Sequence, residues 1–346
     1  MPQKPSYEVH PDRTVTFELR APDASTVRIS GDFGPAQDLK KGDDGTWTVT
    51  LGPLNPALYS YSFTVNGVHV TDPVNPMMQP GDRSSSSMFE VHGDKPATYD
   101  LTSVPHGTVH MNLYDSKSIG AQLMLYIYTP PGYEASTSRY PVLYLLHGSG
   151  DTQSGWVQIG RANLILDNLI AEGKAKPMLI VMPYGRPTGD VTLGQVKPPT
   201  QPQNNGLFME DVLNDIVPFV EKNYRVTANA DSRALAGLSM GGGQTLQIGL
   251  SHLDTFHYLG AFSAASRGNP EEAYKDFFAD PAAANKKLKL FYIACGKADS
   301  LFASAQTMHE ALDKAKIKHT FAPSDEGHVW RNWRAYLSDM APQLFR

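Results

Sequence analysis

A Gly-x-Ser-x-Gly pattern at residues 237–241 constrains the fold of this chain more than any other feature. It follows a short apolar run at residues 234–236 and precedes residues 244–250, whose spacing suits a helix. A serine at the tip of a sharp strand-to-helix turn requires small neighbours two positions away on either side, and Gly237 and Gly241 meet this requirement. The first amides of such a helix point back toward the serine. The pattern therefore predicts a strand, a strained turn that exposes Ser239 as a nucleophile, and a helix.

Two later segments contain candidates for the acid and the base that a serine nucleophile needs. In chains built around this turn the order is nucleophile, acid and histidine, each on a loop after a further strand. The apolar run 288–295 ends at Gly296, and we predict that Asp299, just beyond it, is the acid. Residues 319–322 suit another strand, and His328 in the loop that follows is the predicted general base. Asp325 in the same loop is an alternative acid, but its position suits capping or solvation better.

The loop after the most apolar run, residues 142–146, is expected to complete an oxyanion hole. It contains His147, Gly148, Ser149 and Gly150, and a glycine-rich loop lets a backbone amide turn inward. We predict the backbone amides of Met240 and Ser149 as the two donors to the oxyanion. His147 suits a hydrogen-bonding residue that shapes this loop better than it suits a base.

Two tryptophans and one long loop are candidates for contacts with the substrate. Trp156 comes soon after the predicted oxyanion loop and Trp330 soon after His328, so either could flank an acyl or sugar group; packing in the core is the alternative for both. Residues 186–207 are rich in Gly, Pro, Gln and Asn. A loop of this length beside an active site is often a lid, and disorder is the alternative.

The composition excludes several other classes of function. A formal net charge of −5 over 346 residues gives no basic patch for nucleic acid or an anionic membrane, and no apolar run reaches the length of a bilayer. No metal-ligand spacing and no phosphate-binding loop occur, so no metal or cofactor is expected. The single Cys295 excludes an intrachain disulfide and suits a buried strand position. The N-terminus lacks the apolar core of a leader peptide, which predicts a cytoplasmic protein, or a secreted or periplasmic one if a leader was trimmed.

Several motifs of the C-terminal part resemble a known family. They lie at residues 128–133, 140–148, 181–185, 237–242, 295–300 and 327–330. Together they resemble the esterase D-like α/β-hydrolases, most closely the feruloyl and acetylxylan esterases of carbohydrate esterase family 1. The resemblance implies an α/β-hydrolase domain over residues 107–346 that cleaves acyl esters with Ser239, Asp299 and His328 as its triad.

The first 95 residues show a different pattern. Residues 14–20, 26–30, 46–51 and 59–65 alternate with period two, and turns such as Asn66-Gly67 separate the runs, as in a β-sandwich. The pattern resembles early-set immunoglobulin-like modules grouped with carbohydrate-binding module family 48. Starch-binding members usually carry an aromatic residue soon after the Gly31-Asp32-Phe33 turn, whereas Gly34 and Pro35 follow here. Residues 96–106 mix proline with polar residues and are predicted to be a linker.

These observations predict a serine esterase that acts on plant cell-wall carbohydrate, with feruloyl esters of arabinoxylan as the expected substrate. An acetylxylan esterase and an enterochelin-type siderophore esterase are the alternative enzymes. A carbohydrate-binding protein that has lost catalysis is the alternative from another class. The oligomeric state has no signature in the sequence.

Overall fold

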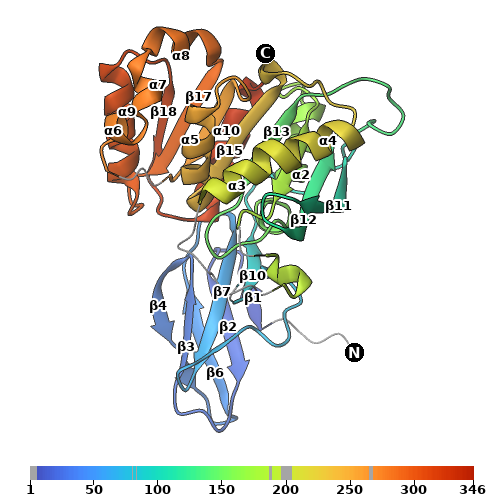
Figure 1. The fold of residues 1–346 in the computed structure, drawn as a ribbon. Coiled ribbons are helices and arrows are strands. Elements are labelled where there is room, and N and C mark those ends of the chain that lie inside the picture. The colour runs from blue at the N-terminus through green and yellow to red at the C-terminus, as the bar shows by residue number, and fades with distance from the viewer. Residues whose placement is uncertain (1–5, 80, 83, 187–188, 196–204, 265–267) are drawn as a thin grey trace. The chain divides into compact units, whose positions relative to one another are not determined.

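The computed structural model describes residues 6–79, 81–82, 84–186, 189–195, 205–264 and 268–346 (Figure 1). The chain divides into two compact units, Met1–Ala97 and Thr98–Arg346. Much of the long loop predicted as a lid, residues 187–188 and 196–204, lies outside the described residues.

The N-terminal unit consists of two antiparallel sheets. The first has the strand order β1 (Tyr7–Val9), β2 (Val15–Arg20), β6 (Thr46–Leu51) and β5 (Lys40–Lys41). The second has the order β4 (Gly34–Asp38), β3 (Val27–Gly31), β7 (Ala57–Val65), β10 (Ser86–Val91) and β9 (Met78–Gln79), and β8 (Val68–Val70) also pairs with β7.

One apolar core joins these two sheets. Alternate residues of β2 and β6 meet alternate residues of β3, β7 and β10 in a single buried cluster. Phe17 of the first sheet and Tyr61 of the second have ring centroids 5.0 Å apart. Period-two burial on facing sheets is what a β-sandwich requires. The unit therefore agrees with the predicted β-sandwich, while its immunoglobulin-like character stays a prediction.

The C-terminal unit is built on an eight-stranded sheet. Its strand order is β11 (Thr108–Ser116), β12 (Ala121–Thr129), β14 (Leu179–Pro183), β13 (Val142–Leu146), β15 (Arg233–Leu238), β16 (Tyr258–Phe262), β17 (Leu290–Gly296) and β18 (Thr320–Ser324). The β11–β12 and β12–β14 pairs are antiparallel, and the pairs from β14 to β18 are parallel. All five residues of β13, β14 and β16 are buried, as expected for central strands covered on both faces. This is the α/β-hydrolase architecture that the resemblance of the C-terminal motifs implied.

Helices cover both faces of this sheet. They are α1 (Gly155–Gln158), α2 (Ala162–Ala171), α3 (Asn205–Asp211), α4 (Val217–Asn223), α5 (Met240–Ser251), α6 (Pro270–Ala273), α7 (Lys275–Ala279), α8 (Pro281–Lys287), α9 (Phe302–Lys314) and α10 (Trp330–Met340). One core cluster contains residues of α3, α4, α5 and α9 together with Leu259 and Ala261 of β16. Phe262, the next residue on β16, points to the other face and contacts Tyr336 of α10. A helical turn with π geometry, Val212–Ile216, joins α3 to α4. The described part of the chain contains no helix long and apolar enough to span a membrane.

Most of the segment predicted as a linker, from Thr98 on, is part of the second unit. Asn168 of α2 donates from its amide to the carbonyl oxygens of Thr98 and Asp100 at 2.8 and 2.9 Å. The Arg334 guanidinium lies 4.7 Å from the ring centroid of Tyr99. His106 hydrogen-bonds the buried carboxylate of Asp167 at 2.9 Å. The prediction missed these contacts because proline and polar residues resemble a solvated linker, whereas here buried side chains of α2 satisfy the backbone.

Candidate active site

Ser239 lies at the tip of the turn between β15 and α5. Its backbone has φ 53° and ψ −113°, a conformation that non-glycine residues rarely adopt. A Cβ on Gly237 would come within 2.6 Å of the Gly241 backbone, and a Cβ on Gly241 within 2.7 Å of the His147 carbonyl oxygen. The Ser239 amide donates to the Phe262 carbonyl oxygen at 2.8 Å, which holds the strained residue in place. The two glycines are thus needed for close packing around the serine.

A hydrogen-bonded row connects Ser239, His328 and Asp299. Ser239 Oγ lies 3.0 Å from His328 Nε2, and His328 Nδ1 lies 2.8 Å from Asp299 Oδ2. The carboxylate can only accept, so Nδ1 carries the proton and Nε2 is left to accept from the serine hydroxyl. The Asp299 side chain is fully buried and its Oδ1 also accepts from the Leu301 amide at 2.9 Å, whereas His328 is 36% exposed. The arrangement can withdraw a proton from Ser239 and stabilise the resulting imidazolium.

The structure distinguishes the two candidate acids. Asp325 has a side chain that is 91% exposed, and its Oδ1 forms an ion pair with Lys297 Nζ at 2.9 Å. Asp299, in contrast, follows β17 directly and faces His328. Gly296 permits this approach, because a Cβ there would overlap the Glu326 carbonyl oxygen of the histidine loop.

His147 shapes the loop after β13, as expected from the sequence. Its Nε2 accepts from the Gly185 amide at 3.0 Å, so Nδ1 carries the proton and donates to the Gly148 carbonyl oxygen at 2.8 Å. The ring is 1% exposed, and burial lowers the pKa of His147 to about 4. His147 is therefore neutral near pH 7, with a fixed tautomer that orients the peptide between Gly148 and Ser149.

The two predicted oxyanion donors lie at the expected places in the fold. Met240 is the first residue of α5, directly after the nucleophile, and Ser149 lies in the turn after β13. Gly148 next to it is close to the nucleophile, since a Cβ there would be 3.4 Å from Ser239 Cβ. The donor role of the two amides stays a prediction.

Two residues near this loop had no motif that could have identified them. Arg186 is only 8% exposed and donates from Nη2 to the Ser149 hydroxyl at 3.2 Å. Gln244 of α5 donates to the Gly185 carbonyl oxygen at 2.9 Å. Arg186 joins the loop after β14 to the loop after β13, and Gln244 joins the loop after β14 to the elbow helix. Only the spatial proximity of β13, β14 and β15 reveals this role.

The two tryptophans that the sequence offered as substrate contacts are buried in the core. Trp156 is 1% exposed and donates to the Leu146 carbonyl oxygen at 3.0 Å, and Trp330 is 5% exposed with its ring 5.1 Å from that of Trp156. A buried indole has no free face for a sugar. The expected substrate contact of Trp156 and Trp330 therefore does not fit the structure, which favours packing in the core. Trp333, not singled out from the sequence, meets the His328 ring edge-on at 4.9 Å and donates to Ser263 Oγ at 3.1 Å. Its indole therefore packs against the His328 ring on the side of the core and supports the position of the histidine.

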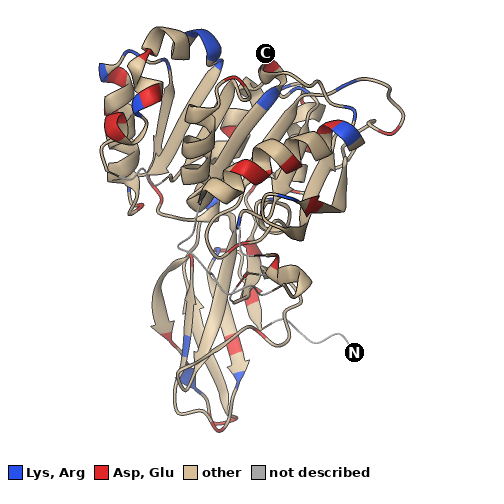
Figure 2. Ribbon diagram, viewed as in Figure 1, with Lys and Arg blue, Asp and Glu red and all other residues tan. Residues whose placement is uncertain are grey.

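The single cysteine is buried beside the triad acid. Cys295 lies on β17 with no exposed surface, and burial followed by the negative charge of Asp299 raises its pKa to about 12. The thiol stays protonated near pH 7 and acts as a small apolar side chain. Positions of Lys or Arg and of Asp or Glu are interspersed along the described residues (Figure 2).

Fold and site together define a class of enzyme. A strained nucleophile elbow and a serine-histidine-carboxylate row at the carboxyl ends of a mostly parallel sheet are the features of a carboxylic ester hydrolase with the α/β-hydrolase fold. The chain belongs to the Esterase family, described as "Putative esterase", whose profile matches residues 116–344.

The comparison with known proteins agrees with this class. The chain is 32% identical over 338 residues to an endo-1,4-beta-xylanase/feruloyl esterase of Xylanibacter ruminicola, covering 95% of this chain and 44% of that protein. It therefore spans less than half the length of this relative. A CE1 ferulic acid esterase of Anaeromyces mucronatus is 25% identical with a TM-score of 0.63, over 72% of this chain and 96% of that one. The enterochelin esterase of Shigella flexneri shares the fold over 99% of this chain and 95% of its own, with 18% identity and a TM-score of 0.74.

Proposed function

We propose that the protein hydrolyses acyl esters on plant cell-wall carbohydrate, foremost feruloyl esters of arabinoxylan, through an acyl-Ser239 intermediate. The row from Ser239 through His328 to Asp299 carries this proposal. The similarity to the xylanase/feruloyl esterase supports the substrate class, since it covers 95% of this chain. That relative's name contains two activities, and the serine-histidine-carboxylate row favours the esterase activity for the part shared with this chain.

In the proposed reaction, Ser239 Oγ attacks the ester carbonyl carbon while His328 Nε2 takes the hydroxyl proton. The carbonyl oxygen becomes an oxyanion, and the amides of Met240 and Ser149 are the proposed donors to it. The tetrahedral intermediate collapses, the C–O bond to the sugar breaks, and His328 returns the proton to the leaving alcohol. Water, deprotonated by His328, then attacks the acyl-serine and releases the acid and free Ser239. Asp299 keeps the imidazole in the required tautomer throughout.

The enterochelin-type alternative has one observation in its favour. The Shigella enzyme matches both units of this chain, whereas the ferulic acid esterase matches 72% of it. An identity of 18% indicates a shared fold only, however, whereas the similarity to the xylanase/feruloyl esterase extends to the amino-acid sequence. Enterobactin therefore belongs in the substrate panel as the competing ester.

For the N-terminal unit we propose a role other than starch binding. Binding modules for glucans stack exposed aromatic rings on sugars. Among the described residues of this unit, the aromatic rings are buried or half-buried: Tyr7, Phe17, Phe33, Trp47, Tyr59, Tyr61, Phe63 and Phe89. Its affinity for starch and for arabinoxylan can be measured by pull-down of the full chain with the Ser239→Ala variant, which prevents turnover. Tight starch binding would refute this part of the proposal.

A substrate panel tests the main proposal. Methyl ferulate, feruloylated arabinose, acetylated xylan and enterobactin differ in acyl group and in leaving alcohol, and kcat/KM should be highest for feruloylated arabinose. A fluorophosphonate should label the wild-type protein at Ser239 and leave the Ser239→Ala variant unlabelled. Hydrolysis of enterobactin alone would replace the proposed substrate, and a protein that is neither labelled nor active on any ester would contradict the proposed activity.

A further inference from the structure

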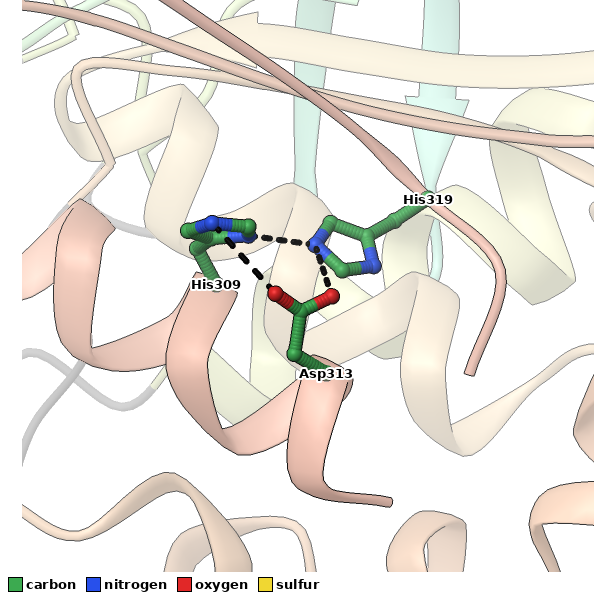
Figure 3. Close-up of side chains that lie close together, drawn as sticks. All are labelled: His309, Asp313 and His319. Carbon is green, nitrogen blue, oxygen red and sulfur yellow. Dashed lines mark hydrogen bonds and ion pairs between the residues drawn. The ribbon is translucent and has the colours of Figure 1, made fainter. Parts of the chain in front are cut away.

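Three potential metal ligands meet far from the triad. His309 and Asp313 are one turn apart on the same face of α9, and His319 directly precedes β18 (Figure 3). Among the described residues, these three form a group of potential metal ligands in which the ligand atoms all lie within 4.8 Å of one another. His309 Nδ1 is 2.7 Å from His319 Nε2, and the Asp313 carboxylate oxygens lie 3.5 Å from His309 Nε2 and 3.9 Å from His319 Nε2.

A tight helix end brings His319 back to α9. Lys316 has φ 56°, and its amide donates to the Asp313 carbonyl oxygen at 3.0 Å. The Ile317 amide donates to the Leu312 carbonyl oxygen at 2.9 Å, which completes the hydrogen-bond pair of a left-handed helix C-cap. No sequence motif surrounds His309, because only this reversal of the chain places it against His319.

The ligand atoms are held by their own neighbours. His319 Nδ1 lies 2.8 Å from the Ile317 carbonyl oxygen, which can only accept. Nδ1 therefore carries the proton, and Nε2 presents a lone pair toward His309 and Asp313. His309 stacks on Phe321 with centroids 4.5 Å apart and an interplanar angle of 14°, which limits the tilt of its ring. The His319 side chain is 4% exposed and Asp313 is 65% exposed, so the cluster has a rigid inner side and a side open to solvent.

We propose that His309, Asp313 and His319 form a Zn²⁺ site. Two imidazole nitrogens and one carboxylate oxygen are a donor set that zinc accepts, with water as the fourth ligand, whereas Ca²⁺ and Mg²⁺ prefer oxygen alone. Tetrahedral Zn²⁺ with bonds of about 2.05 Å would set the two nitrogens about 3.3 Å apart. The present distance of 2.7 Å between His309 Nδ1 and His319 Nε2 is shorter than this spacing, so the two imidazoles must move apart by about 0.6 Å to hold the ion.

The position of the site makes its role structural. Asp299 precedes α9 and His328 follows β18, so the segment that carries the site connects the triad acid to the triad histidine. The triad lies at the carboxyl ends of the strands, while His319 stands at the amino end of β18, the last strand in the sheet order. Zinc would bind the end of α9 to this outer strand. It would raise stability without taking part in the reaction, and the inference does not depend on the substrate of the enzyme.

The competing interpretation is a hydrogen-bonded cluster without metal. A protonated His309 would donate from Nδ1 to His319 and from Nε2 to Asp313, which satisfies the same contacts. Zinc binding separates the two interpretations, because a proton-held cluster would bind no ion with a defined stoichiometry.

The test uses the untagged full chain after treatment with a chelator. Isothermal titration with ZnCl₂ should give one high-affinity site per chain, and zinc should raise Tm in a saturable way. Co²⁺ at the site should give the visible absorption of a tetrahedral complex. His319→Ala should weaken Zn²⁺ binding by at least tenfold and abolish the Tm shift and the Co²⁺ spectrum. Asp313→Asn changes an exposed side chain, so it retains the fold and should also weaken binding.

A matched control is available on the same unit. His257 and Asp231 form an imidazole–carboxylate pair at 2.7 Å, with Lys289 Nζ 3.9 Å from the same carboxylate. The pair has no part in the proposed site, so His257→Ala should leave zinc affinity and the Tm shift unchanged. The proposal is overturned if the wild-type chain binds no zinc. It is equally overturned if the His319→Ala and Asp313→Asn variants bind zinc as tightly as the wild type.

Discussion

The replacement Asp299→Asn tests the triad most directly, because it changes the charge while it retains the shape. The asparagine Oδ1 can still accept from the Leu301 amide, which now bonds Asp299 at 2.9 Å. Its amide nitrogen would occupy the place of Oδ2, 2.8 Å from His328 Nδ1, and would donate where the carboxylate accepts. His328 would then carry its proton on Nε2 and could no longer accept from Ser239.

The expected loss follows from this change of tautomer. The same substitution in serine protease triads lowers kcat about 10⁴-fold, which corresponds to about 5 kcal/mol of transition-state stabilisation. Asp299 is fully buried, and among the described residues it is the carboxylate that hydrogen-bonds His328 Nδ1. A loss of this order is therefore expected here.

The assay compares kcat/KM on methyl ferulate and on a small aryl acetate for the wild type, Asp299→Asn and Asp325→Asn. Asp325→Asn is the matched control, because its side chain is 91% exposed and pairs only with Lys297. It should stay within about twofold of the wild type. Thermal unfolding checks that both variants are folded. An Asp299→Asn variant within tenfold of the wild type, together with an inactive Asp325→Asn variant, would refute the assignment of the acid.

Three further outcomes are expected. Gly237→Ala should lower stability by about 3 kcal/mol or more and abolish activity, since its Cβ would lie 2.6 Å from the Gly241 backbone; thermal unfolding and ester turnover measure both effects. Burial holds the pKa of His147 near 4 in the folded protein against about 6.5 in the unfolded chain, so the unfolded state binds more protons between these values. The stability that neutral His147 contributes is complete above pH 6.5 and declines by about 3 kcal/mol as the pH falls toward 4. In urea titrations at several pH values, the free energy of unfolding of His147→Gln should therefore fall less steeply over this pH range than that of the wild type. Trp333→Phe should cost about 1 kcal/mol through the lost bond to Ser263 and lower kcat modestly, and an unchanged Tm would contradict the buttressing role.

Some parts of this protein were predictable because local sequence carries the physical constraint. The elbow is recognisable since only glycine fits at positions 237 and 241, where a Cβ would meet backbone atoms. Alternation with period two revealed the strands of the N-terminal unit, because each strand buries one side against a shared core. The order of Ser239, Asp299 and His328 followed from the order of strands in the sheet, and the structure brings the three together.

Tertiary structure decided what depends on residues distant in the chain. Residues 98–106 look like a linker, but the buried side chains of α2 bind them. Trp156 and Trp330 stand next to catalytic motifs in sequence, yet both point into the core, because side-chain direction depends on packing rather than on proximity along the chain. The choice between Asp299 and Asp325 required burial and distance, which sequence spacing does not contain. His309 and His319 became neighbours only through the left-handed turn at Lys316, so their cluster is a property of the folded chain alone.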